Sequence, residues 1–191
     1  MNIIYWGSVF DMKYVIADLH FDHEAIIGFS NRPFKTVSEM NQQLIERWNA
    51  SVKNPNDEVY ILGDFLIGKS GKRANDILQQ LNGKKYLIKG NHEDYLNDPL
   101  FNLKNYEWIK DYYSFRYQKR KFVLFHYPIL EWDGYFKSAI LLYGHVHQTR
   151  QSFFENTLGY TAVNVGADMI GYAPMSLDNI IDEVNLKESE L

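Results

Sequence analysis

The chain has 191 residues, of which 46% are hydrophobic and 23% are charged. This length favours one domain, or two at most, with a core that buries roughly 70% of the surface of the unfolded chain. The composition excludes collagen-like, coiled-coil and wholly disordered chains. Lys and Arg number 20 and Asp and Glu number 24, a net charge of −4. The chain therefore lacks the overall basic field of a general duplex-binding protein.

The chain contains no cysteine. Disulfide scaffolds, thiolate zinc sites, iron–sulfur clusters and cysteine nucleophiles are thereby excluded. No apolar run approaches the roughly 20 residues of a membrane span. The first ten residues are apolar but carry no early Lys or Arg, so they make a poor signal peptide. We therefore expect a cytoplasmic protein with no membrane partner.

The first half of the chain alternates short apolar runs with helical patterns. Residues 36–39 read Thr-Val-Ser-Glu, a capping box, and apolar side chains follow at helical spacing, which predicts a helix over 37–50. A second helix is expected over 72–81, before Asn82 and Gly83. Short apolar runs that stop at polar residues or glycine predict buried strands over 13–18, 58–62 and 85–89.

The second half is richer in strands. Residues 112–117 and 121–125 are apolar runs on either side of a polar turn, which predicts a hairpin. Two further strands are expected over 139–143 and 161–165, and Ser176 is placed to cap a final helix through Val184. Alternating strands and helices followed by several strands favour a layered α/β (α+β) fold.

The placement of histidine is the most informative feature of the sequence. Five of the six histidines stand at or just beyond the ends of expected strands, where α/β sheets bind their ligands. If the backbone of D-x-H and H-x-H is strand-like, both side chains of each pair point to the same side. The polar residues at these strand ends are Asp18, His20, Asp64, Asn91, His92, His126, His145 and His147.

Together these side chains offer imidazole nitrogens, carboxylate oxygens and an amide oxygen. Such a mixed set suits divalent Mn, Fe, Zn, Co or Ni and is too rich in nitrogen for calcium. The donors exceed what one tetrahedral site uses, whereas two ions that share a bridging carboxylate would use them all. Two ions about 3.5–4 Å apart form a clamp for in-line displacement at phosphorus and generate hydroxide near neutral pH.

Each motif taken alone also has a purely structural interpretation. Asp18-x-His20 is compatible with a polar loop, and Gly63-Asp64 is a common turn dipeptide. Gly90-Asn-His-Glu is compatible with a left-handed turn, and His126 with a strand-terminal histidine that bonds locally. Their joint occurrence, each after an expected strand, argues against chance.

The order D-x-H, G-D, G-N-H-[DE], a lone H and G-H-x-H resembles the calcineurin-like metallophosphoesterase superfamily, from Asp18 to His147. Within this superfamily, the sequence of the motifs is most similar to that of small, single-domain bacterial and phage phosphoesterases. The segments NRPF at 31–34 and NVG at 164–166, with Asp168 and Pro174, add to this resemblance. The resemblance implies two mixed β-sheets packed as a sandwich flanked by helices.

The resemblance also implies roles for individual residues. Two divalent ions would be bound, with Mn favoured and Fe, Zn, Co or Ni open. Asp64 would bridge them, and His92 would act on the substrate phosphate or the leaving oxygen without binding metal. The remaining ligands would be Asp18, His20 and His147 for the first ion and Asn91, His126 and His145 for the second.

The expected reaction is hydrolysis of a small or nucleotide-like phosphate ester by a metal-bridging hydroxide that attacks phosphorus in line. A phosphodiesterase is favoured over a monoesterase. Two alternatives stay open: a phosphoesterase fold used as a binding module with weak or no catalysis, and a nuclease that acts on nucleic-acid ends. Duplex nucleic acid is disfavoured as a partner, and a homo-oligomer is left open.

Several further residues have two interpretations each. His23 would reach substrate or bond within the site, and Arg32 would clamp a phosphate or be a solvated loop arginine. Glu93 would orient His92 or lie in a surface loop. Trp132 and Tyr135 would stack on a base or cover the core. Residues 119–121, Lys-Arg-Lys, form a basic hairpin tip that is a solvated turn or a nucleic-acid patch.

The expected domain organisation is simple. The resemblance implies a start near Met12, which directly precedes the first expected strand, so residues 1–11 are expected to form an N-terminal extension. Residues 12–186 form a single metallophosphoesterase domain, and residues 187–191 form a polar tail.

Overall fold

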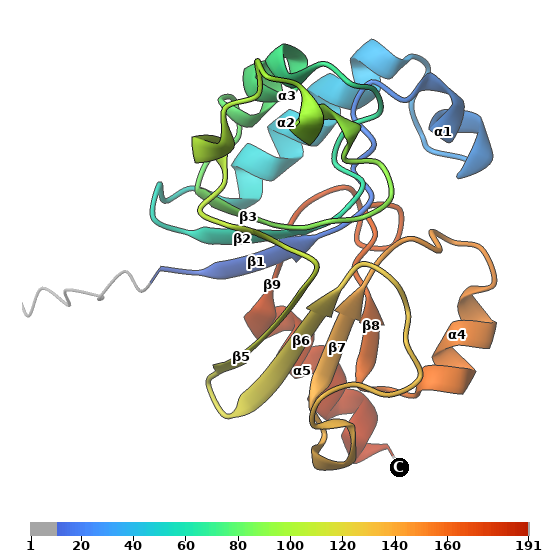
Figure 1. Ribbon diagram of the computed structural model, residues 1–191. Helices are drawn as coiled ribbons and strands as arrows, with labels where there is room; N and C mark the ends of the chain where they lie inside the picture. Colours follow the sequence, from blue (N-terminus) through green and yellow to red (C-terminus); the bar gives the residue numbers. More distant parts are fainter. Residues whose placement is uncertain (1–10, 191) are drawn as a thin grey trace, which may run out of the picture.

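The computed structural model describes residues 11–190, which form two β-sheets packed face to face and flanked by helices (Figure 1). The first sheet has the order β4-β3-β2-β1-β9, with β9 antiparallel to β1 and the other neighbours parallel. Its strands are β1 (Lys13–Ile16), β2 (Glu58–Leu62), β3 (Lys84–Ile88), β4 (Ile109–Lys110) and β9 (Met175–Ser176).

The second sheet has the order β5-β6-β7-β8. The hairpin β5–β6 is antiparallel, whereas β6, β7 and β8 run parallel to one another. Its strands are β5 (Tyr112–Tyr117), β6 (Arg120–Phe125), β7 (Ile140–Tyr143) and β8 (Ala162–Asn164). The predicted sandwich of two mixed sheets with helices is thereby confirmed.

Helices cover both outer faces of the sandwich (Figure 1). The Thr36 hydroxyl accepts a hydrogen bond from the Glu39 N–H at 3.1 Å and so starts α2 where the capping box predicted. The helices are α1 (Glu24–Phe29), α2 (Val37–Ser51), α3 (Gly71–Leu78), α4 (Gln151–Leu158) and α5 (Leu177–Ser189), with 3-10 turns η1 (Asp94–Asn97), η2 (Leu103–Asn105) and η3 (Tyr135–Lys137).

Three apolar clusters correspond to the layers of this fold. One lies between the first sheet and α2 and α3, where Met40, Leu44 and Trp48 are fully buried. The second joins the two sheets across the sandwich and also takes the buried side of α5. The third lies on the outer face of the second sheet, where Trp132 and Leu158 cover the strands. Both sheets are therefore held rigidly by the same central core.

Some predicted boundaries differ from the structure. The first strand ends at Ile16, short of residue 18, because Asp18 adopts a left-handed φ of 55° that cannot continue a strand. The last helix continues past Val184 to Ser189, into the residues expected to form a polar tail. Helices α1 and α4 were not predicted. Residues 1–10 of the expected N-terminal extension lie outside the described residues, and the domain division stays a prediction.

The ends of several strands meet at one place. The Ala17 N–H donates to the Val165 carbonyl at 2.8 Å, so the segments after β1 and β8 join the two sheets. Within the second sheet, the Gly144 N–H donates to the His126 carbonyl at 2.9 Å. The carboxyl ends of β1, β2, β3, β6 and β7 all open onto this junction. Across residues 11–190, no helix is both long and apolar enough to cross a membrane.

Candidate metal centre

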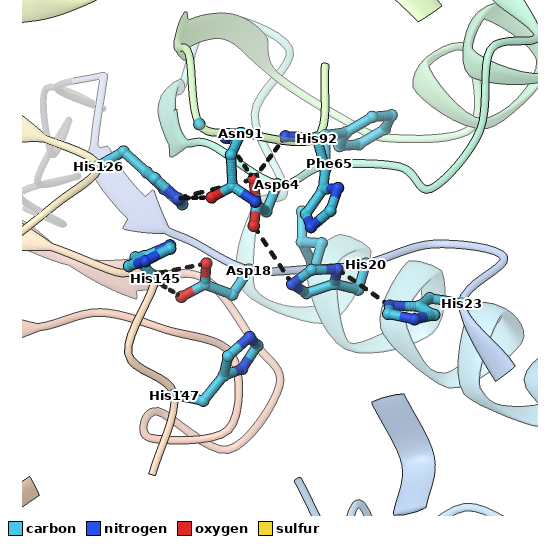
Figure 2. A network of polar contacts seen from close by, with 12 residues as sticks. Asp18, His20, His23, Asp64, Phe65, Asn91, His92, His126, His145 and His147 are labelled. Carbon is cyan, nitrogen blue, oxygen red and sulfur yellow. Dashed lines mark hydrogen bonds and ion pairs between the residues drawn. The ribbon is translucent and has the colours of Figure 1, made fainter. Parts of the chain in front are cut away.

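Five loops bring the polar residues of the sequence motifs together at the junction of the two sheets (Figure 2). Six of these side chains form two groups of potential ligands, and within each group the ligand atoms lie within 4.8 Å of one another. The first group consists of Asp18, His20 and His147, and the second consists of Asp64, His126 and His145. The structure thus brings together the side chains that the motifs pointed to.

The first group is almost entirely buried. Asp18 has no exposed surface, and its carboxylate accepts hydrogen bonds from the His145 N–H at 3.0 and 2.8 Å. The His20 and His147 rings stack with their centroids 5.0 Å apart. The His20 Nε2 atom lies 3.5 Å from Asp64 Oδ2 and is buried without a hydrogen-bond partner in the described structure. An unpartnered nitrogen at this depth is what a metal ligand without its ion presents.

The second group is oriented by hydrogen bonds to the backbone. His126 Nδ1 lies 2.7 Å from the Leu62 carbonyl oxygen, which turns the ring so that Nε2 faces the centre. That Nε2 atom is 3.2 Å from Asn91 Oδ1 and 3.6 Å from Asp64 Oδ1. Asp64 therefore has one carboxylate oxygen directed at each group, which is the placement that a bridging ligand requires (Figure 2).

The backbone at these positions is left-handed. Positive φ angles occur at Asp18 (55°), His20 (53°), Asp64 (54°), His145 (71°) and His147 (48°). The expectation that D-x-H and H-x-H are strand-like is therefore wrong, although their side chains still converge. Left-handed backbone costs a residue with a Cβ roughly 1–2 kcal/mol, and it turns each chain sharply as its strand ends. Such strain concentrates at functional sites, where the surrounding fold maintains it.

Two motif glycines are required by close packing. A Cβ on Gly63, whose φ is 86°, would lie 2.5 Å from His126 Nδ1. A Cβ on Gly144 would lie 2.6 Å from Asp18 Oδ2 and 2.5 Å from the Ala17 Cβ. The glycines of G-D and G-H-x-H thus let two loops approach the ligands closely.

Burial perturbs the ionisation of the site in a way that favours a bound cation. Burial raises the pKa of Asp18 to about 8, with Asp64 adding to the shift and His147 opposing it. Burial also lowers the pKa of His20 to about 2, with His147 and Arg32 contributing. A divalent ion is bound by neutral imidazoles, and it stabilises the charged form of a buried carboxylate that otherwise loses its proton only at a cost. The donor set therefore fits the two divalent ions that the motifs implied.

A buried chain of polar contacts supports the first group from behind. His147 Nδ1 lies 2.5 Å from Asp168 Oδ2, which leaves Nε2 of His147 free for a ligand. Asp168 Oδ1 lies 2.7 Å from Arg32 Nε, and the Arg32 guanidinium donates to the carbonyls of Asp18 at 2.7 Å and Leu19 at 2.9 Å. Asp168 was not predicted as a site residue. In the sequence, the only indication of its importance was its position close to the NVG segment.

Arg32 does not have either of its expected roles. Its guanidinium is fully buried and engaged by Asp168 and two carbonyl oxygens, so it cannot clamp a substrate phosphate. The alternative of a solvated loop arginine is wrong for the same reason, since only 4% of the residue is exposed. Arg32 instead ties the loop after β1 to the loop after β8.

The other motif residues lie around the two groups. His23 Nδ1 is 3.3 Å from His20 Nδ1, so His23 bonds within the site. Glu93 is buried and accepts hydrogen bonds from the backbone N–H groups of Phe65 and Gly90, at 3.1 and 2.6 Å. These bonds take the place of the expected hydrogen bond to the His92 imidazole. Glu93 therefore shapes the loops around Asp64, and a surface-loop position is wrong. The burial of Glu93, together with nearby Asp64, raises its pKa to about 7.

His92 is exposed and belongs to neither group of potential ligands. Its backbone N–H donates to Asp64 Oδ1 at 3.0 Å, and its ring lies at the rim with its centroid 5.6 Å from that of His20. Figure 2 shows it beside Asp64 and close to His20, away from His147. It is thus placed beside the two groups and outside both of them.

Comparison with known proteins identifies the family of the chain. The family model described as calcineurin-like phosphoesterase matches residues 14–134, more than half of the chain. An uncharacterized protein of Methanocaldococcus jannaschii is 35% identical over 175 residues, which cover 88% of each chain. The crystal structure of a protein of unknown function from Aquifex aeolicus is similar with a TM-score of 0.71 and 27% identity, and covers 91% of this chain and 99% of that one. The chain therefore belongs to the calcineurin-like phosphoesterase family.

Proposed function

We propose that this protein is a divalent-metal-dependent phosphodiesterase that hydrolyses small or nucleotide-like phosphate esters. The observation that carries the proposal is the position of Asp64, whose two carboxylate oxygens face His20 Nε2 at 3.5 Å and His126 Nε2 at 3.6 Å. One carboxylate between two clusters of nitrogen donors supports a pair of ions that share a ligand.

The ligands follow from the two groups. Asp18, His20 and His147 hold the first ion, Asp64 bridges, and Asn91, His126 and His145 hold the second. Asn91 belongs with the second group because its Oδ1 is 3.2 Å from His126 Nε2. Imidazole, carboxylate and amide donors suit Mn²⁺, which we favour, and also Fe, Zn, Co or Ni.

Two divalent ions held in this way supply Lewis-acid stabilisation of phosphoryl oxygens and activate water near neutral pH. The protein residues supply the rest. Asn91 is a neutral ligand and so limits the negative charge that an anionic phosphate meets. His92, exposed at the rim, hydrogen-bonds a phosphoryl oxygen and donates a proton to the leaving oxygen. Asp64 positions His92 by accepting its backbone N–H.

The complete donor set separates this proposal from its alternatives. A binding module without catalysis has no need for an exposed histidine beside a complete set of seven donors, and both features are present here. A nuclease that acts on nucleic-acid ends would use the same ions and differs in its substrate, so a direct assay with single-stranded and duplex ends decides between them.

The test is hydrolysis of bis-p-nitrophenyl phosphate and of p-nitrophenyl phosphate after chelation and re-addition of Mn²⁺. We expect the diester to be cleaved faster than the monoester, and only with metal. Asp64→Asn should abolish the activity, whereas Asp182→Asn, an exposed carboxylate on α5, should not. A protein that binds two ions and cleaves neither ester would overturn the phosphodiesterase proposal, and a protein that binds no ion would overturn the metal centre itself.

A further inference from the structure

A cavity of about 880 Å³ lies on the outer face of the second sheet, between the β5–β6 hairpin and residues 129–139. Two features that were separate in the sequence meet there: the basic hairpin tip at 119–121, and the loop that carries Trp132 and Tyr135. Its volume is within the range of small-molecule sites, about 300–1,000 Å³. None of the candidate metal ligands lines it.

Apart from Tyr112, which pairs with Phe125 next to His126, the cavity lies toward the far end of the strands from the metal centre. It is lined from the amino ends of β6 and β7, by Arg120, Lys121 and Ala139, whereas His126 and His145 follow the carboxyl ends of these strands. In Figure 1 the hairpin turn and η3 are at the lower edge of the second sheet, opposite the arrowheads. The six residues of β6 separate the hairpin tip from His126 by roughly 20 Å.

The lining of the cavity is positively charged, although the chain carries a net charge of −4. Five Lys or Arg side chains and two acidic side chains line it. Two of the cations are engaged, since Lys121 pairs with Asp133 and Arg120 pairs with Glu188. The other three are exposed and form no ion pair within residues 11–190: Arg116, Lys119 and Lys137. Free cations around a concave surface favour an anionic ligand.

Aromatic side chains supply the rest of the lining. The Trp132 indole N–H donates to the Ala139 carbonyl at 2.8 Å, and its ring meets Tyr135 edge-on with centroids 4.7 Å apart, so this wall is rigid. These two rings cover the core of the second sheet, as one of their two interpretations expected. Phe136 and Tyr112, by contrast, are 86% and 40% exposed at the cavity. Exposed rings beside cations are suited to stacking on a base.

We propose that this cavity is a second ligand site, which binds a phosphate-bearing aromatic molecule of the mononucleotide type. The phosphate contacts Arg116, Lys119 and Lys137, and the flat ring stacks on Phe136 or Tyr112. The site is independent of the proposed hydrolytic function, because none of its lining residues is a candidate metal ligand. Binding there requires no divalent ion.

The test is calorimetric titration of AMP into the full chain in the presence of EDTA, with adenosine and inorganic phosphate as separate probes. The variant Arg116→Ala/Lys119→Ala removes two free cations from the cavity. Its matched control is Lys53→Ala/Lys72→Ala, which removes two exposed lysines that do not line the cavity. Asp64→Asn tests whether the metal centre contributes, and Phe136→Ala tests the stacking surface.

We expect saturable binding of AMP that weakens about tenfold or more in Arg116→Ala/Lys119→Ala, because charged hydrogen bonds to phosphate are lost. Phe136→Ala should also weaken it, whereas the lysine control and Asp64→Asn should bind like the wild type. The absence of saturable binding, an unchanged affinity in the cavity variant, or loss of binding in Asp64→Asn would overturn the proposal. Equal affinity for phosphate or for adenosine alone would overturn the ligand class.

Discussion

Arg32 Nε lies 2.7 Å from Asp168 Oδ1, and neither side chain has any exposed surface. Removing two charges from water is costly unless their remaining hydrogen-bonding atoms are also satisfied. In this pair the remaining atoms are satisfied. Arg32 donates hydrogen bonds to the carbonyls of Asp18 and Leu19, and the second carboxylate oxygen of Asp168 is hydrogen-bonded to His147 Nδ1. The pair therefore joins the NRPF and NVGAD segments and reaches two of the proposed ligands of the first ion.

Asp168→Asn should weaken binding of Mn²⁺ about tenfold or more, because a carboxylate behind a ligating histidine orients the ring and raises its basicity. The measurement is a competitive titration against a fluorescent chelator, on protein whose fold is confirmed by circular dichroism. Asp182→Asn makes the same chemical change at an exposed position on α5 and serves as the control. Equal Mn²⁺ affinity in the two variants would contradict a positioning role for Asp168.

Arg32→Ala should lower the free energy of unfolding by about 3–5 kcal/mol, since it leaves Asp168 buried without its partner. Urea denaturation in the presence of EDTA measures this without a contribution from metal. Arg73→Ala is the control, because Arg73 also pairs with a carboxylate, Asp22, but its side chain is 43% exposed. Exposed pairs contribute about 0–1 kcal/mol. Similar losses in both variants would show that burial of the Arg32 pair has no special importance.

The sequence was sufficient to locate the candidate site because its signal is local. Each pair of polar residues follows an apolar run, and parallel strands place the ends of such runs at one edge of a sheet. The strand-like backbone expected at Asp18 and His145 was wrong. Asp and His adopt left-handed φ angles more often than most residues other than glycine, but still in a minority of cases, so the sequence indicates such a turn only weakly. The sandwich itself followed from the family resemblance, since strand order is not encoded in any single segment.

The parts that could not be predicted depend on contacts between distant segments. Arg32 and Asp168 are far apart in the chain, and a loop arginine beside proline looks the same whether it is solvated or buried. Helix α1 has six residues, of which only Ile26 is buried, so it leaves no apolar periodicity. Glu93 was expected to orient His92, its neighbour in sequence, or to lie in a surface loop, whereas the fold gives it the backbone N–H groups of Phe65 and Gly90.

The stability of the fold should fall on acidification partly through Glu58. Burial raises the pKa of Glu58, but hydrogen bonds from Lys13 and Tyr60 outweigh it and hold the pKa below its ordinary value of 4.5. A carboxylate with a lowered pKa in the folded state contributes stability above its unfolded pKa, and that contribution is lost as the pH falls through the folded pKa. Glu58→Gln should therefore be less stable than the wild type at about pH 6, with the difference closing by about pH 3.

Urea denaturation at several pH values measures this difference. Glu183→Gln changes an exposed glutamate on α5 that accepts no hydrogen bond from another described side chain, and it should show a small difference from the wild type at every pH. A gap between Glu58→Gln and the wild type that widens on acidification would have the wrong sign for this mechanism.

Gly63→Ala should disturb the metal centre as well as the fold. Gly63 has a φ of 86°, and an added Cβ would lie 2.5 Å from His126 Nδ1 and 2.7 Å from the Gly90 Cα. The imidazole would have to move away from the Leu62 carbonyl that orients it, and Nε2 would move with it. Mn²⁺ affinity should therefore fall together with stability.

The control separates this contact from simple backbone strain. Gly171 has a similar φ of 73°, but an added Cβ there meets nothing within 4 Å. Both alanine variants carry the cost of a left-handed residue, and only Gly63→Ala adds overpacking of about 1–3 kcal/mol. If Gly171→Ala lowers stability and Mn²⁺ affinity as much as Gly63→Ala does, strain alone accounts for the glycine, and the contact with His126 does not determine how the second ion is held.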